Sequence, residues 1–277
     1  MVSYRQLFST FWRIGWLSLG GPAAQIALMH SELVDRHRWL TERQYLRALS
    51  LCMLLPGPEA MQLATYAGWR LRGIPGGLIS GGLFVLPGAL VIAALAAAYT
   101  AWGQLPWVQA AFFGIKACVL VIVIEALLRV SKRALKGPAH RLIALGAFIA
   151  IAVFAVPFPI VILIAAALGA LMRAAPAEAV AATHPAKGLW VLLPGIPIWL
   201  APVGLAWLAG STFLTTLGLF FAKLAIVTFG GAYAVLTYMT QTVVQDLGWL
   251  TTGQMIDALG LAETTPGPLI LVTEFVA

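Results

Sequence analysis

The chain has 277 residues, of which 61% are hydrophobic and 10% are charged, and its formal net charge is +7. Because soluble domains carry about 25% charged residues, this composition excludes an ordinary soluble protein and indicates a multi-pass membrane protein. The excess positive charge lies in short loops, where Lys and Arg set membrane orientation, so we do not expect nucleic acid as a partner.

The first two apolar segments are both interrupted by residues that break helices. The segment 7–30 contains Gly20-Gly21-Pro22, and the segment 48–69 contains Pro56-Gly57-Pro58. Proline removes a backbone donor and clashes with the preceding helical turn. We therefore expect neither segment to form one straight helix. Between them lies a polar stretch with four arginines from 36 to 47.

The middle of the chain contains apolar runs that are long enough to cross a membrane, which takes about 20 residues. We expect full spans at 76–101, 107–130 and 189–209. The shorter runs 142–156 and 159–172 are predicted to form a helical hairpin that turns at Pro157-Phe158-Pro159.

The first part of the chain is repeated near its end. Phe11 to Ala67 aligns without a gap with Phe221 to Ala277, at an offset of 210 residues, and 17 of the 57 aligned pairs are identical. The identities include both Gly-Gly pairs and both Pro-Gly-Pro triplets. Interrupted apolar segments at corresponding places in two halves indicate the binding site of a transporter. We predict a first repeat at 1–172, a cytoplasmic linker at 173–188 and the start of a second, incomplete repeat at 189–277.

Charge predicts that the two repeats face opposite sides of the membrane. The stretch 246–257 contains Asp246 and Asp257 and no basic residue, whereas its counterpart 36–47 has four arginines. Cytoplasmic loops are enriched in Lys and Arg, and five predicted spans between the repeats give the same inversion. An odd number of spans inverts the second repeat. If 142–172 crossed the membrane only once, the number would be even and both repeats would face the same side. The predicted fold is an all-α, polytopic membrane protein with inverted repeats and broken, re-entrant helices.

The breaks themselves are candidate binding sites. A Gly-Gly pair can serve close packing, or it can present free backbone N–H groups to an anion at a helix N-terminus. Within lipid, such a break is tolerated only inside protein or beside a wet cavity, and its occurrence in both repeats favours the cavity. The candidates are Gly20, Gly21, Pro56, Gly57, Pro58, Gly230, Gly231, Pro266, Gly267 and Pro268.

Polar residues lie next to the Pro-Gly-Pro triplets in both repeats. Gln62 in the first repeat and Thr264 and Thr265 in the second are candidate substrate ligands. Glu59 and Glu263 are candidates for proton coupling, because carboxylates at membrane depth are costly and usually functional, and desolvation favours their protonated form. The alternative is a carboxylate that reaches water at the end of a segment.

Three cations could offset the charge of an anionic substrate. Arg13 and Lys223 are equivalent, and each lies seven residues, close to two helical turns, before its glycine pair. The alternative for both is a side chain that snorkels to the interface. Lys116 lies near the middle of 107–130, where insertion of an ammonium costs about 2.5–3.5 kcal/mol. Within that helix Glu125 falls on the opposite face, so Lys116 needs a partner from another segment or an anionic substrate.

The sequence has no phosphate-binding loop, no His-Glu-x-x-His helix and no Gly-x-Ser-x-Gly motif. We therefore expect no enzyme activity, no cofactor and no metal site. The two cysteines, Cys52 and Cys118, lie in apolar segments and are expected to be small buried hydrophobic residues.

Several motifs together resemble the chromate transporter family. They are the glycine motif at 19–26, the Pro-Gly-Pro motif at 54–64, the Leu-Pro-Gly motif at 84–88, and the second-half motifs at 228–235 and 261–269. The resemblance implies a bacterial inner-membrane protein that exports chromate by the proton-motive force, with two oppositely oriented halves in the long members. Leu19 stands where the first motif usually has Phe. By the repeat offset, counterparts of 76–172 would follow Ala277, so we expect a truncated long member.

Three functions are open at this point. The first is chromate efflux through a site near the midplane, with chromate, protons and the lipid bilayer as partners and a homodimer as one possible assembly. The second is transport of sulfate or another oxyanion of the same shape and charge. The third is a membrane partner that transports nothing.

Overall fold

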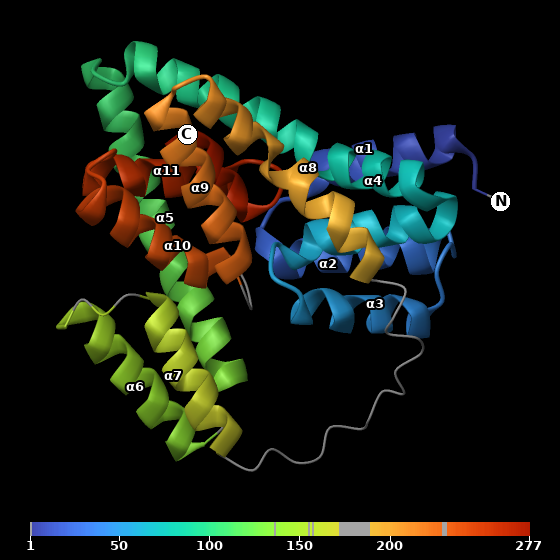
Figure 1. Cartoon of the computed structure of the whole chain (residues 1–277), viewed down its shortest axis with the longest axis horizontal. Coiled ribbons are helices and arrows are strands. Elements are labelled where there is room, and N and C mark those ends of the chain that lie inside the picture. The colour runs from blue at the N-terminus through green and yellow to red at the C-terminus, as the bar shows by residue number, and fades with distance from the viewer. Residues whose placement is uncertain (1, 136, 155, 157, 172–188, 229–231) are drawn as a thin grey trace. The chain divides into compact units, whose positions relative to one another are not determined.

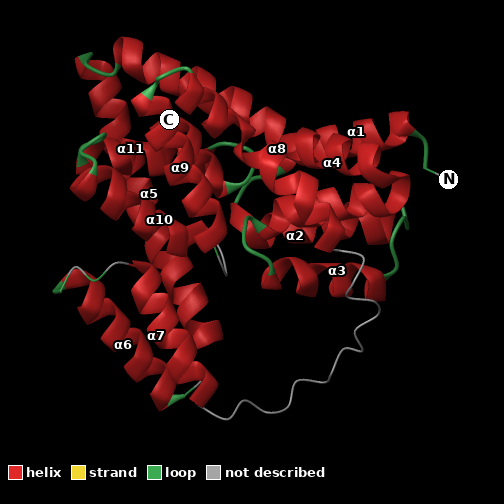
Figure 2. Ribbon diagram, in the orientation of Figure 1, coloured by secondary structure: helices red, strands yellow, loops and turns green. Residues whose placement is uncertain are grey.

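The structure is a computed structural model, and it describes residues 2–135, 137–154, 156, 158–171, 189–228 and 232–277 (Figure 1). Within these ranges the regular structure consists of helices and no strand occurs (Figure 2), which confirms the all-helical prediction. The chain divides into two units, one formed by 1–131 with 226–277 and the other by 132–225.

The first unit begins with α1 (Tyr4–Leu17), α2 (Gly21–His30), the π-helix η1 (Ser31–Arg36) and α3 (Glu42–Leu54). The predicted breaks are confirmed, because α1 ends and α2 begins around Gly20 and α3 ends just before the triplet that contains Gly57. The φ angles of these two glycines are 83° and 115°, a region that residues with a Cβ atom rarely adopt.

Helix α4 (Glu59–Trp102) is a hairpin of two helical parts that meet at Arg72 and Gly73, where the backbone is not helical. The parts approach closely, since a Cβ atom at Gly68 would lie 2.2 Å from the carbonyl oxygen of Gly76. A Cβ atom at Gly81 would lie 2.3 Å from Thr65 Oγ1, so the two parts run antiparallel.

Helix α1 packs along α4 (Figure 1). A Cβ atom at Gly15 would lie 2.3 Å from the carbonyl oxygen of Leu83, so only glycine allows this approach. The core between these helices contains fully buried aliphatic and aromatic side chains, among them Leu7, Phe11, Ile14, Leu63 and Phe84. Helix α4 as a whole meets the length and composition needed to cross a membrane, and its part after Gly73 contains the predicted span 76–101.

The rest of the first unit contains most of α5 (Pro106–Ala134), α10 (Ala232–Thr240), the π-helix η3 (Gln241–Asp246), α11 (Thr252–Thr264), the 3-10 helix η4 (Leu269–Leu271) and α12 (Val272–Val276). The sequence repeat is also a repeat of structure. Both ends of α3 and of η1 recur in α11 and η3 at the offset of 210 residues. The capping box of Thr41 and Gln44 recurs in Thr251 and Gln254.

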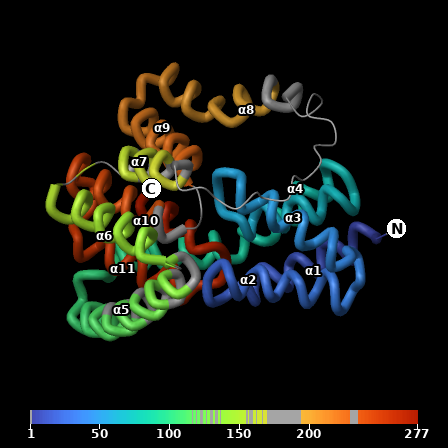
Figure 3. The backbone as a smooth tube through the Cα atoms, turned by 90° about the horizontal axis from the view of Figure 1, so that it is seen from below, coloured from blue at the N-terminus to red at the C-terminus, as the bar shows by residue number. Residues whose placement is uncertain are grey.

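The second unit contains α6 (Pro138–Ala152), α7 (Phe158–Leu171), α8 (Leu189–Leu208) and most of α9 (Thr212–Val227). Helices α6 and α7 lie side by side (Figure 3), as expected for the predicted hairpin, and line an open apolar pocket of about 430 Å³. Pro157 and the linker 173–188 lie outside the described residues.

Candidate functional site

The two Pro-Gly-Pro triplets are each bonded to the glycine break of the other repeat. The backbone N–H of Gly57 donates to the carbonyl oxygen of Thr228 at 2.8 Å, and that of Gly267 donates to the carbonyl oxygen of Ser18 at 2.8 Å. The repeat offset maps Ser18 onto Thr228 and Gly57 onto Gly267. Reciprocal contacts of this kind are the signature of a two-fold relationship, so the first break of each repeat meets the second break of the other.

These bonds use the backbone donors of the triplets. Proline has no N–H group, so glycine carries the one donor within each triplet, and Gly57 and Gly267 both donate to carbonyl oxygens. The triplets therefore join the two repeats through backbone hydrogen bonds. The glycine break at Gly20 and Gly21 differs, because α2 begins there without a side-chain cap, and the first-turn N–H groups of a helix have no partner within it.

Gln25 of α2 contacts both Ser18 and Gly267, where the two repeats meet at a place that we call the crossing. The sequence analysis missed this residue. Its side chain is 1% exposed, and Nε2 donates to the carbonyl oxygens of Gly267 at 2.7 Å and Ser18 at 3.4 Å. Because the carbonyl oxygen of Gly267 can only accept a hydrogen bond, the amide nitrogen of Gln25 must face it. Oε1 is then a buried acceptor with no hydrogen-bond partner in the described structure, a place that a water molecule, a proton donor or an ion could fill. The available signal was a lone amide in an apolar run beside the glycine pair.

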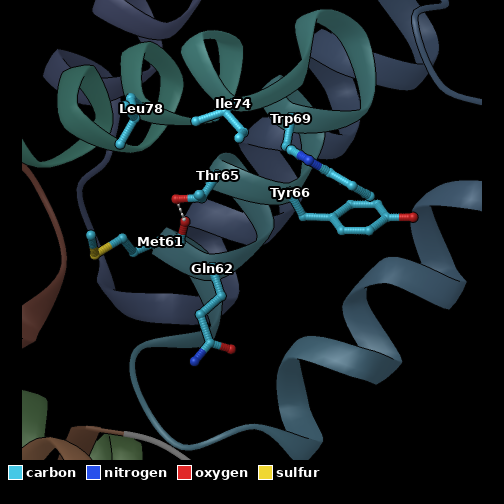
Figure 4. Close-up of a pocket in the computed structure, with 8 residues that line it drawn as sticks. Met61, Gln62, Thr65, Tyr66, Trp69, Ile74 and Leu78 are labelled. Carbon is cyan, nitrogen blue, oxygen red and sulfur yellow. Dashed lines mark hydrogen bonds between the residues drawn. The ribbon is translucent and has the colours of Figure 1, made fainter. Parts of the chain in front are cut away.

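Gln62, a predicted ligand, lies in the first turn of α4 and bonds back to the first triplet. Its Nε2 donates to the carbonyl oxygen of Pro56, and its Oε1 is likewise buried without a partner in the described structure. Gln62 lies at the end of a cavity of about 430 Å³ between the two parts of α4 (Figure 4). Apolar side chains line most of this cavity, and Ile74 and Leu78 are more than 70% exposed. Such a groove suits hydrocarbon better than an oxyanion.

The second triplet rests on α4 and follows two predicted threonines. A Cβ atom at Gly88 would lie 2.2 Å from the carbonyl oxygen of Pro266. Thr264 Oγ1 donates to the carbonyl oxygen of Gly260 at 3.0 Å, and Thr265 Oγ1 donates to that of Ala262 at 3.3 Å. Both hydroxyl protons therefore serve the last turn of α11. To donate to an anion, these hydroxyl groups would have to give up their hydrogen bonds to the carbonyl oxygens of α11.

The carboxylates at the triplets are only partly enclosed, and a different carboxylate is buried. Glu59 and Glu263 are half-buried. Asp257 is 5% exposed, and its Oδ2 accepts a hydrogen bond of 3.0 Å from the hydroxyl of Tyr99 on α4. The sequence analysis counted Asp257 as a loop charge, which is wrong, because α11 begins at Thr252 and carries Asp257 into the protein.

The predicted cations do not all lie at the crossing. Arg13 Nη1 lies 3.7 Å from Glu32 Oε1, so its described ion pair is with a carboxylate of η1. Lys223 is exposed on α9 within the second unit. Lys116 belongs to α5, but its side chain lies outside what the structure describes, as do Gly230 and Gly231.

Comparison with known proteins gives one family. The family model described as "Chromate transporter" matches residues 5–170 and 215–277. The "Probable chromate transport protein" of Synechococcus elongatus is 32% identical over 276 residues, which cover 99% of this chain and 68% of that protein. The "Chromate transport protein" of Pseudomonas aeruginosa is 33% identical over 99% of this chain and 66% of that protein, and that of Cupriavidus metallidurans is 33% identical over 98% and 66%.

The chain therefore spans about two thirds of the length of these curated relatives. No solved structure matches it.

Proposed function

We propose, from the premise that this chain belongs to the chromate transporter family, that it exports chromate across the bacterial inner membrane by the proton-motive force. The chain is an all-helical, polytopic membrane protein of that family. The observation that carries the proposal is the reciprocal bonding of Gly57 to Thr228 and of Gly267 to Ser18. It supports a shared site where the broken segments of two inverted repeats meet.

The proposed anion site combines the two breaks with the three candidate cations. Free N–H groups at the start of α2 carry the positive end of the helix dipole, and the triplets give the site its shape. A buried dianion also needs cationic partners. The proposed ligands are Arg13, Gly20, Gly21, Pro56, Gly57, Pro58, Gln62, Lys116, Lys223, Gly230, Gly231, Thr264, Thr265, Pro266, Gly267 and Pro268.

Proton coupling requires a carboxylate whose access to water changes during transport. Glu59 and Glu263 remain proposed for this role. Asp257 joins them, because it is more deeply buried and is held by a hydrogen bond from Tyr99 on another helix. A carboxylate in such a place is usually functional in a membrane protein.

The proposed domain division follows from the sequence repeat and from the charges of 36–47 and 246–257. The first repeat would be 1–172, the cytoplasmic linker 173–188 and the second repeat 189 onward, with opposite orientations in the membrane. Cysteine labelling of 36–47 and of 246–257 from each side of the membrane tests the inversion. Labelling of both stretches from the same side would contradict it.

The function is tested by measuring chromate in cells. Cells that express this chain should accumulate less chromate than cells with an empty vector, and collapse of the proton gradient should abolish the difference. Lys116→Met should abolish export while the protein remains inserted. Equal accumulation in expressing and empty-vector cells would favour a non-transporting membrane partner. Suppression of chromate export by competing sulfate in an efflux assay would extend the substrate class to sulfate.

A further inference from the structure

Two arginines and one histidine converge on one buried carboxylate at η1. Glu32 is 8% exposed at its side chain, and Arg36 Nη1 donates to its Oε1 at 3.2 Å and its Oε2 at 3.1 Å. Arg13 Nη1 from α1 lies 3.7 Å from Oε1, and His37 Nε2 lies 3.6 Å from Oε2. The two carboxylate oxygens are thus held from three sides.

The charge at this cluster is not balanced by Glu32 alone. Arg13 and Arg36 remain protonated at any ordinary pH, so two permanent positive charges face one negative charge. The neighbouring carboxylate, Asp35, is directed to His30 at 3.4 Å and is not among the groups that contact this cluster. A tetrahedral dianion would match the two guanidinium groups better than one carboxylate does, and guanidinium is the side chain best suited to bind oxyanions.

Solvent can reach the cations from outside while Glu32 lies beneath them. The side chains of Arg13 and Arg36 are 51% and 54% exposed. The buried hydroxyl of Thr10 lies 3.4 Å from His37 Nε2 and adds a possible donor at the inner side. An anion from solution could therefore meet both arginines without unfolding of the protein, and the Glu32 side chain is the group that would have to turn aside.

The cluster is not a requirement of the local backbone. The second repeat forms the same six-residue π-helix, η3, at the equivalent position. There Thr242, Asp246 and Leu247 replace the carboxylate, the arginine and the histidine. A π-helix is rare and is often found at functional sites, and in the first repeat Arg36 at its end and His37 directly after it contact Glu32.

We propose that Arg13, Arg36 and His37 form a loading site for a tetrahedral oxyanion, which the Glu32 carboxylate occupies as a tethered competitor until the oxyanion displaces it. That the oxyanion is chromate rests on the proposed function, whereas the site itself does not.

Binding of sulfate to the purified chain in detergent tests the site, because sulfate has the required shape and charge and is not an oxidant. Calorimetry and thermal unfolding should show that Glu32→Gln binds sulfate at least tenfold more tightly than the unmodified chain, with a larger rise of Tm in sulfate. Ionic strength is kept constant with chloride, so that screening does not contribute.

The matched control is Asp35→Asn, which removes the same charge from the same π-helix but from a carboxylate that contacts His30. It should bind sulfate within twofold of the unmodified chain. The double variant Glu32→Gln with Arg36→Gln should lose the gain. A shorter variant, Glu32→Asp, keeps the charge and should show a smaller gain, which tests the site even if Glu32→Gln does not fold.

The proposal is overturned if folded Glu32→Gln or Glu32→Asp binds sulfate no more tightly than the unmodified chain, or if Asp35→Asn gains as much. Chromate efflux by the unmodified chain is measured separately in cells. Efflux without a gain in sulfate binding rejects the loading site alone, and a gain without efflux rejects the proposed function alone.

Discussion

The backbone N–H of Gly57 donates to the carbonyl oxygen of Thr228 across 171 positions of sequence, and the same bond recurs between Gly267 and Ser18. Ser18 and Thr228 are both almost completely buried, so the two bonds lie inside the protein, where a backbone group without a partner is costly. The Pro-Gly-Pro triplets therefore fix the two repeats to each other first, and any role in substrate binding depends on this arrangement.

Gly88 should not tolerate a side chain. In Gly88→Ala the new Cβ atom would lie 2.2 Å from the carbonyl oxygen of Pro266 and 2.5 Å from Leu271 Cδ1, so the second triplet must shift. Overpacking of this kind costs about 1–3 kcal/mol. We expect a lower Tm in detergent and reduced chromate export. Gly82→Ala is the control, because a Cβ atom there meets nothing within 4 Å. Equal Tm values for the two variants would contradict the packing argument.

Gln25 should be required for the crossing of the repeats. Gln25→Leu removes the bond to the carbonyl oxygen of Gly267 and leaves that buried acceptor without its donor, which costs about 1–3 kcal/mol. Gln109→Leu, at an exposed position of α5, is the control and should change Tm little. If Gln25→Leu is as stable as the unmodified chain and exports chromate normally, the amide has no structural or transport role.

The breaks could be predicted from sequence because their cause is local. Proline and glycine act on the backbone at their own positions, so Gly20 and Gly57 mark helix ends whatever surrounds them. The repeat offset then predicted where the second set of breaks lies, and α11 ends directly before the second triplet, as expected.

The partners across the fold could not be predicted in the same way. Gln25 and Gly267 are 242 residues apart, and periodicity shows which face of a helix is apolar without showing what that face meets. For the same reason Asp257 was assigned to a loop, and the pairing of Arg13 with Glu32 was not foreseen. The partners of these residues depend on tertiary structure, which their charge and spacing in the sequence do not give.

Tyr99 should stabilise the buried carboxylate of Asp257. Tyr99→Phe removes the hydroxyl that donates to Asp257 Oδ2 at 3.0 Å and keeps the ring that contacts Phe112 and Phe275. Removal of a donor from a buried acceptor costs about 1–3 kcal/mol, so Tm should fall by several degrees. If Asp257 carries protons, export should also change its dependence on pH.

The control for this variant is Tyr66→Phe in the same helix, where the ring packs against Trp69. It should leave both Tm and the pH dependence of export unchanged. A loss of Tm in Tyr99→Phe without any change in the pH profile would assign Asp257 a structural role and leave proton coupling to Glu59 or Glu263.

His30 should make stability depend on pH at the end of α2. The hydrogen bond of 2.6 Å to Glu42 is the main cause that raises the pKa of His30 above 6.5. Burial opposes this shift, and the charges of Glu42 and of Asp35, at 3.4 Å, add to it. The other neighbour is Tyr45, whose ring edge meets the imidazole at 5.1 Å between ring centroids. Because the pKa is higher in the folded state, the stabilisation is complete below about pH 6.5 and is lost as the pH rises through the folded pKa.

His30→Gln removes this titration, so the unmodified chain should have the higher Tm at pH 6 and the advantage should shrink as the pH approaches 9. Thermal unfolding of both proteins in detergent across this range measures the difference. His140→Gln, at an exposed position near the start of α6, should leave the profile of the unmodified chain in place. A constant difference between His30→Gln and the unmodified chain from pH 6 to 9 would mean that the imidazole contributes by packing against Tyr45 and not by its charge beside Glu42.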